Sequence, residues 1–166
     1  PIPAEWAPVP VDAAGRSAYG LYLSGRVAGI RGDRAASAEL LALSHALTPE
    51  QPGVGEEAFR SSLFTGDLQT VVRLAPWVSD TPLLAEAGRL FRVVEALIRD
   101  DGRAALETFD ARSFSAPYAS AGRYLAPAVA AAGGDWERAL RPVEVAAENP
   151  AGLILRLQRA QLLEHR

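Results

Sequence analysis

Apolar side chains recur three or four positions apart along most of this chain, and this spacing places them on one face of an α-helix. The pattern includes Leu21, Val27, Ile30, Leu40, Leu41, Leu47, Leu90, Val93, Val94, Leu97 and Ile98. No convincing stretch alternates apolar and polar residues with a period of two, and β-branched residues, which strands favour, are sparse. The pattern therefore predicts an all-α fold.

The expected turns are marked by four aspartates, each 34 positions after the one before it. They are Asp33, Asp67, Asp101 and Asp135. A glycine directly precedes three of them, at Gly32, Gly66 and Gly134, whereas Asp100 stands before the third. Glycine readily takes the left-handed conformation that ends a helix, and aspartate accepts hydrogen bonds from the free N–H groups that begin the next one. The spacing predicts a helix hairpin repeated every 34 residues.

A second series of residues marks the opposite turns, about half a period later. It consists of Pro49, Pro82, Pro117 and Pro150, at intervals of 33, 35 and 33 residues. Proline is tolerated in the first turn of a helix but ends the helix before it. We therefore expect first helices near 13–31, 53–65, 82–99, 116–132 and 150–166, and second helices near 34–47, 68–78, 102–111 and 136–147.

This helix–turn–helix period resembles the tetratricopeptide repeat, whose pattern is large-x2-Leu-Gly-x2-Tyr, then Ala-x3-Phe, then Pro. The first copy reads Leu21-x2-Ser24-Gly25-x2-Ala28, Ser37-x3-Leu41 and Pro49. The third reads Ala105-x3-Phe109 and Pro117, and the fourth reads Gly134-Asp135-Trp136-Glu137-Arg138-Ala139-Leu140. The second copy departs from the pattern, with Val71 and Ala75 at the packing positions and Pro76 ending its second helix early. Pro127 predicts a kink or break in a first helix.

The resemblance implies a right-handed superhelical array of antiparallel helix pairs over residues 13–166. Its repeats would lie near 18–51, 52–85, 86–119 and 120–152, with a partial one at 153–166, behind a proline-rich extended segment at 1–12. Small residues would let paired helices approach closely, at Gly25, Ser37, Ala105 and Ala139. Larger residues would fill the gap to the next pair, at Leu41, Phe109 and Val143.

Charge and composition narrow the classes of partner. The chain has 17 basic residues, all of them arginine, and 20 acidic ones, for a net charge of -3. With no basic run, nucleic acid is not an expected partner. The chain has no cysteine, which excludes disulfides, thiolate metal sites and a cysteine nucleophile. No apolar run reaches the roughly 18 residues of a membrane-spanning helix, so we expect no membrane span.

No set of residues stands out as catalytic or metal-binding. His45 and His165 lie on different expected helices without partners at ligand spacing, so we interpret His45 as a structural or surface residue. The segment 53–58, Gly-Val-Gly-Glu-Glu-Ala, only superficially matches a dinucleotide fingerprint, because it follows a proline-rich turn and two carboxylates would face the phosphates. We therefore expect a protein that is not an enzyme, with no metal and no cofactor.

The resemblance implies a concave groove lined by first helices. Adding 34 repeatedly follows one stripe through Tyr22, Glu56, Leu90, Tyr124 and Gln158, and a second through Arg26, Arg60, Val94, Ala128 and Leu162. We take as candidate partner-binding residues Tyr22, Arg26, Glu56, Arg60, Leu90, Val94 and Tyr124. Tyrosine and arginine are enriched at binding hot spots. The alternative is that Arg26 and Arg60 merely pair with Glu56 and Glu57 on a solvated face.

The sequence thus favours a non-catalytic bacterial scaffold that binds a peptide or partner protein in its groove. A second interpretation is a docking or regulatory region of a larger enzyme, of glycosyltransferase or sulfotransferase type, whose catalytic part lies outside this chain. A third is self-association through the last helix, which carries Leu153, Leu155, Leu157 and Leu162. The proline-rich start without Met favours an exported protein, and the compartment stays open.

Overall fold

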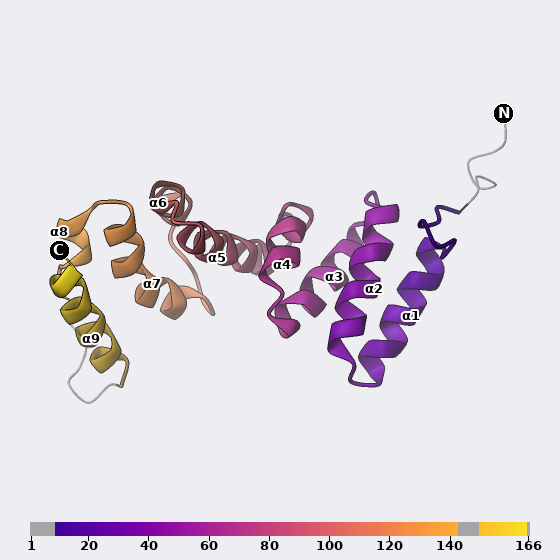
Figure 1. Cartoon of the computed structure of the whole chain (residues 1–166), viewed down its shortest axis with the longest axis horizontal. Helices are drawn as coiled ribbons and strands as arrows, with labels where there is room; N and C mark the ends of the chain where they lie inside the picture. Colours follow the sequence, from indigo (N-terminus) through magenta and orange to yellow (C-terminus); the bar gives the residue numbers. More distant parts are fainter. Residues whose placement is uncertain (1–8, 143–149, 166) are drawn as a thin grey trace. The chain divides into compact units, whose positions relative to one another are not determined.

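The computed structural model describes residues 9–142 and 150–165 of the chain. Within these ranges the structure is helical, with no β-strand, so the all-α prediction is confirmed (Figure 1). The elements are α1 (Ala18–Ile30), α2 (Arg34–Leu47), α3 (Pro52–Thr65), α4 (Leu68–Leu74), the 3₁₀ helix η2 (Ala75–Val78), α5 (Pro82–Ile98), α6 (Gly102–Asp110), α7 (Ala119–Ala132), α8 (Trp136–Ala139) and α9 (Pro150–His165).

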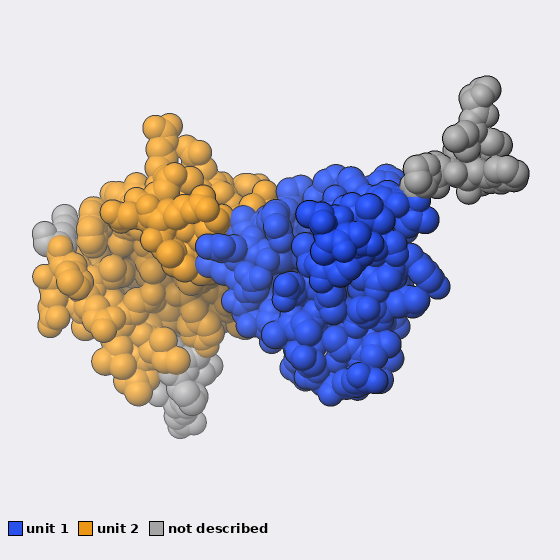
Figure 2. Space-filling model, turned by 45° about the vertical axis from the view of Figure 1, so that its right-hand side comes forward, with its two compact units in different colours: residues 1–88 blue, residues 89–166 orange. Residues whose placement is uncertain are grey.

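The chain divides into two compact units, Pro1–Gly88 and Arg89–Arg166, and the division falls within α5 (Figure 2). In the first unit, α1 packs against α2, α2 against α3, and α3 against both α4 and η2. In the second unit, α6 packs against α7, which also contacts α8 and α9. Helices that are neighbours in the sequence are therefore neighbours in each unit.

The four aspartates of the 34-residue series begin four second helices in the same way. Each carboxylate accepts a hydrogen bond from the backbone N–H three residues later, at distances of 3.0 to 3.1 Å. The donors are Ala36, Thr70, Ala104 and Arg138. Each bond satisfies an N–H group that has no partner within its own helix. The predicted turns are confirmed at all four positions.

The residue before each aspartate has a left-handed backbone. Its φ angle is +84° at Gly32, +72° at Gly66, +86° at Gly134 and +59° at Asp100. In every turn the aspartate N–H also bonds back to the carbonyl oxygen five residues earlier, at 2.8 to 3.3 Å. This pattern of a left-handed residue and a six-to-one hydrogen bond satisfies a carbonyl at the end of the first helix. Asp100 takes the same left-handed conformation, although its side chain makes positive φ less favourable than it is for glycine.

Small residues bring the paired helices together as expected. Gly25 is buried, and a Cβ atom there would lie only 2.9 Å from Cγ of Leu41. The positions 34 residues apart at Ser37, Val71, Ala105 and Ala139 are all at most 5% exposed. The second unit centres on Val93, Ala105 and Val129, with Leu125 and Phe109 packed around them. One register therefore defines the inner face of the second helices in both units.

Several expected helix boundaries are wrong. The helix expected over 13–31 begins at Ala18, because the Ser17 side chain accepts from the N–H of Gly20 and caps it. The helix expected over 136–147 ends at Ala139, because Pro142 lacks an N–H and disfavours helical backbone before it. Residues 143–149 of that segment, including Val143, lie outside the described residues, as do 1–8 of the proline-rich segment.

Two further expectations concern prolines. Pro76 ends α4 early as expected, and a 3₁₀ turn continues from Ala75 to Val78. Of the kink or break expected at Pro127, the break does not occur, because α7 continues from Ala119 to Ala132 with Pro127 buried inside it. A helix interior loses one hydrogen bond at such a proline, and the burial of apolar neighbours such as Val129 and Ala130 offsets that loss.

Not every residue of the helical apolar pattern lies in the core. Leu21 is 2% exposed, but Val27 is 44% exposed and Ile30 82%. The positions equivalent to Ile30 in the next two repeats, Phe64 and Ile98, are also exposed. They stand at or near the end of a first helix, where the chain turns.

The left-handed backbone of Asp100 generates a stability prediction. Replacing Asp100 with glycine relieves the strain of a side chain at positive φ, partly offset by the greater freedom of glycine in the unfolded chain. We expect Asp100→Gly to raise the free energy of unfolding by about 0.5–1 kcal/mol in urea titrations. As the matched control, Gly134→Asp should lower it by about the same amount. A destabilised Asp100→Gly protein would contradict the turn geometry.

A second prediction concerns His45, which is buried on α2 with its ring edge-on to Trp77 at 5.0 Å between centroids. Its ring nitrogens have no hydrogen-bond partner in the part of the chain described. Burial lowers the pKa of His45, the Arg73 charge lowers it further, and Glu50 opposes this. The unfolded chain therefore takes up a proton that the folded chain resists, so stability should fall as the pH drops through about 6.5.

The measurement is the free energy of unfolding in urea at pH 7.5 and 5.5, for the wild type, His45→Leu and the control His165→Gln. The histidine contribution amounts to at most about 1.4 kcal/mol per pH unit. We expect His45→Leu to lose that part of the pH dependence and His165→Gln to keep it, because His165 is exposed. Equal pH dependence in all three proteins would show that His45 is not protected from protonation.

Candidate functional site

The candidate groove residues are divided between the two units. Tyr22 and Arg26 lie on α1, and Glu56 and Arg60 lie on α3, in the first unit. Their guanidinium groups and carboxylates are one-third to one-half exposed. The remaining candidates, Leu90, Val94 and Tyr124, lie in the second unit and are all partly buried.

Arg26 links the first helices of two hairpins. Its Nη1 donates to the Tyr22 hydroxyl at 3.1 Å, and its Nε lies 3.0 Å from Oε1 of Glu57 on α3. The Tyr22 hydrogen bond and the Glu57 charge raise the pKa of Arg26 above its usual value. The guanidinium also stands over the Tyr22 ring, 5.9 Å from its centroid. One arginine therefore joins side chains of α1 and α3 on a single surface.

Glu56 extends this arrangement along α3. Its carboxylate pairs with Nη2 of Arg60 at 3.6 Å and accepts a short hydrogen bond from the Thr81 hydroxyl, next to the start of α5. Both arginines thus pair with acids, as the alternative interpretation holds. We call Tyr22, Arg26, Glu56, Glu57 and Arg60 the first-helix surface. Its charges compensate one another, and its side chains remain half-exposed.

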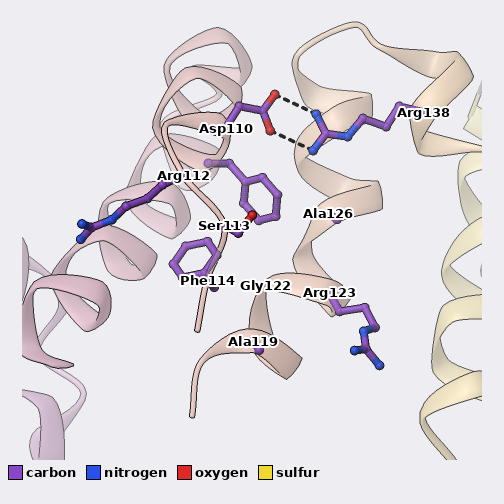
Figure 3. A pocket seen from close by; sticks show the side chains of 10 residues that line it. Asp110, Arg112, Ser113, Phe114, Ala119, Gly122, Arg123, Ala126 and Arg138 are labelled. Atoms are coloured by element: carbon purple, nitrogen blue, oxygen red, sulfur yellow. Dashed lines mark hydrogen bonds and ion pairs between the residues drawn. The ribbon is translucent and has the colours of Figure 1, made fainter. Parts of the chain in front are cut away.

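The structure also contains a feature that the sequence analysis missed, a hollow of about 280 Å³ in the second unit (Figure 3). It is formed by the end of α6, the chain that follows it, the first half of α7 and one residue of α8. Its walls are the aromatic rings of Phe109 and Phe114 on one side and the α7 residues Ala119, Gly122 and Ala126 on the other. Its lining also includes Asp110, Arg112, Ser113, Arg123 and Arg138.

A buried arginine holds the chain that follows α6. Arg89 on α5 is only 4% exposed. Its Nη1 donates to the carbonyl oxygens of Arg112 at 2.7 Å and Phe109 at 3.1 Å, and its Nη2 donates to that of Ser113 at 3.2 Å. Its guanidinium lies against the Phe114 ring, 3.6 Å from the centroid. A cation is favourable here because the carbonyls at a helix end lack partners within the helix.

The repeat register of the sequence could have identified Arg89 as a buried arginine. Arg89 is 68 residues, or two periods, after the buried Leu21, so the register places it at a core position. Buried arginines are rare unless they are paired or hydrogen-bonded. An arginine at an apolar position of the repeat therefore indicates carbonyl acceptors nearby, although the sequence could not say which ones.

The aromatic wall of the hollow is closely packed. The rings of Phe109 and Phe114 lie 5.6 Å apart between centroids. A Cβ atom at Gly122 would lie 2.8 Å from Cδ2 of Phe114, so only glycine lets α7 approach this ring without a shift. With Arg89 behind it, Phe114 is held from two sides.

An ion pair closes one end of the hollow. Arg138 on α8 donates from both terminal nitrogens to both carboxylate oxygens of Asp110 on α6, at 2.7 and 2.8 Å (Figure 3). This pair lowers the pKa of Asp110 and raises that of Arg138. Two-point pairing of this kind fixes orientation as well as charge. Asp110 therefore adds no uncompensated negative charge to the lining.

The other two arginines of the lining, Arg112 and Arg123, are exposed. Neither guanidinium makes an ion pair in the part of the chain that the structure describes. In Figure 3 their side chains leave the hollow on opposite sides, so the charged groups stand at its rim rather than inside it.

The last helix, α9, has both buried and exposed leucines. On α9, Leu155 is buried, whereas Leu153 and Leu157 are more than half exposed. The described residues hold no group of three or more His, Cys, Asp and Glu placed to bind a metal ion. Among the described helices, none has the length and apolar character needed to cross a membrane.

Three comparisons with known proteins were made, against family models, curated proteins and solved structures. The chain gave no significant match in any of them.

The buried arginine generates a prediction. Replacing Arg89 with Met keeps much of the volume but leaves several partly buried carbonyl oxygens without this donor, so we expect a loss of about 2–4 kcal/mol in the free energy of unfolding. Arg92→Met on the same helix is the control, because Arg92 is exposed, and it should change stability by less than about 0.5 kcal/mol. Urea titrations of both proteins make the test, and equal small effects would contradict the role given to Arg89.

Proposed function

We propose that this chain is a non-catalytic binding module built from tetratricopeptide-like helix hairpins, which holds a peptide or a segment of a partner protein on its first-helix surface. The observation that carries the proposal is the contact of Arg26 with both Tyr22 and Glu57. It brings side chains of α1 and α3 onto one half-exposed surface, where a ligand can touch two hairpins at once.

The chemistry of this surface suits an extended polypeptide. Tyr22 offers a ring and a hydroxyl, and arginine side chains offer several donors in a fixed plane. These residue types are frequent at the energetic centres of protein interfaces. The first hairpin presents Tyr22 and Arg26, and the second presents Arg60, so a ligand that lies across both helices can contact each in turn.

The internal ion pairs do not block binding. Half-exposed pairs of this kind contribute only about 0–1 kcal/mol each. A carboxylate of the ligand can therefore replace Glu57 beside Arg26, or Glu56 beside Arg60, with little loss of stability. The compensated charges also disfavour unspecific attraction of any anion, because no excess charge remains on the surface.

The test is a selection of peptides from a displayed random library on the immobilised full chain. We expect enriched peptides whose affinity falls about tenfold or more in the double variant Tyr22→Ala/Arg60→Ala, because loss of a hot-spot side chain weakens binding by more than about 1 kcal/mol. The matched control Tyr19→Ala/Arg103→Ala removes an exposed tyrosine and an exposed arginine elsewhere and should keep the affinity.

Circular dichroism should show the same helicity for all three proteins, because the replaced side chains lie on the surface. The proposal is wrong if no peptide is enriched over a library passed on the blank support. It is equally wrong if the enriched peptides bind the Tyr22/Arg60 double variant as tightly as the wild type.

A further inference from the structure

The size of the hollow beside Phe114 limits what it can hold. Ligand pockets for drug-sized molecules usually measure about 300–1,000 Å³. At about 280 Å³ and open to solvent, this hollow fits one side chain or a similar small group rather than a cofactor. An occupant would be a part of a larger molecule that lies across the surface.

The walls of the hollow are held by contacts within the chain. Arg89 donates to one carbonyl group of α6 and to two of the chain after it, and it lies against Phe114. Gly122 lets α7 close on the same ring. Binding to a site that is already ordered avoids the entropy that would be lost in ordering a side chain or loop. The hollow is therefore suited to binding even a small group.

The residues that line the hollow carry an excess of positive charge. Its lining carries Arg112, Arg123 and Arg138 against a single acid, Asp110, and Arg138 is engaged with that acid. The remaining excess of two positive charges contrasts with the net charge of -3 for the whole chain. The guanidinium groups of Arg112 and Arg123, which make no ion pair with the described residues, stand at the rim on opposite sides of the hollow.

We propose that this hollow is a second binding site, which takes an acidic side chain of a partner polypeptide. The aliphatic part of a glutamate lies against Phe109 and Phe114, and its carboxylate meets the guanidinium of Arg112 or of Arg123, which flank the hollow on opposite sides. A guanidinium and a carboxylate can form two parallel hydrogen bonds, which gives direction to the contact. The inference rests on the proposed function, because it adds an acidic residue to the ligand of the same module.

The experiment uses the full chain labelled with ¹⁵N and the probe N-acetyl-Leu-Glu-amide, titrated to 10 mM and followed by NMR. We expect saturable shifts of backbone amides within residues 109–126. The uncharged probe N-acetyl-Leu-Gln-amide should bind about fivefold or more weakly, since it lacks the carboxylate. Inorganic phosphate, titrated alone, tests whether any anion suffices.

Two charge-matched variants locate the site. Arg112→Gln/Arg123→Gln removes both rim cations, leaves the backbone carbonyl of residue 112 to Arg89, and should weaken binding of the glutamate probe about fivefold or more. Arg26→Gln/Arg60→Gln removes the same charge from the first-helix surface and should leave the shifts within residues 109–126 unchanged. Circular dichroism of both variants should match the wild type.

The inference is overturned if the glutamate probe gives no saturable shifts, if the glutamine probe or phosphate alone reproduces them, or if the Arg112/Arg123 variant binds like the wild type. Such a failure is distinct from failure of the proposed function. Peptides obtained by display that still depend on Tyr22 and Arg60 would leave the binding module in place and remove only the acidic-residue site.

Discussion

The hydrogen bond from a backbone N–H to an aspartate carboxylate, at the first turn of each second helix, is the constraint on which this structure depends. It occurs four times at 34-residue intervals, each time directly after a residue with positive φ. The carboxylate satisfies the start of one helix, and the left-handed residue satisfies the end of the previous one. Because both ends are fixed within three residues, the two helices must turn back on each other, and small residues such as Gly25 and Ala139 let them pack closely.

This repeated turn also determines where the exposed chemistry lies. Within the first unit, the hairpins place α1 and α3 so that Arg26 reaches both Tyr22 and Glu57. The resulting surface carries a tyrosine and an arginine on α1 and a second arginine, Arg60, on α3. Within the second unit, α6 ends after nine residues, and Arg89 donates to the Phe109 carbonyl near its end and to the Arg112 carbonyl just after it. The chain that follows α6 then forms one wall of the hollow at Phe114. One site thus follows from the regular register, and the other from a departure from it.

Local signals in the sequence predicted much of the fold. The spacing of aspartates located all four turns, and the second helix expected over 34–47 coincides with α2, because capping acts over only three residues. Signals that depend on distant contacts were less informative. Helical spacing placed Ile30 with the core, although its side chain is exposed. The helix expected over 136–147 was too long, because the effect of Pro142 on the preceding backbone was not considered. The hollow could not be predicted for the same reason, since tertiary packing alone brings together Arg89, Phe114, Gly122 and Arg138. The candidate residues on α1 and α3, by contrast, could be found by counting the 34-residue period.

The most direct test of the hairpin register is an assignment of backbone chemical shifts and amide exchange for the full chain. The account predicts that helical shifts are interrupted at 31–33, 65–67, 99–101 and 133–135. It also predicts that the amides bonded to the four aspartates exchange more slowly than unbonded first-turn amides, because exchange requires the hydrogen bond to open. Those amides belong to Ala36, Thr70, Ala104 and Arg138. An uninterrupted helix through any of the four turns, or breaks displaced from the aspartates, would contradict it.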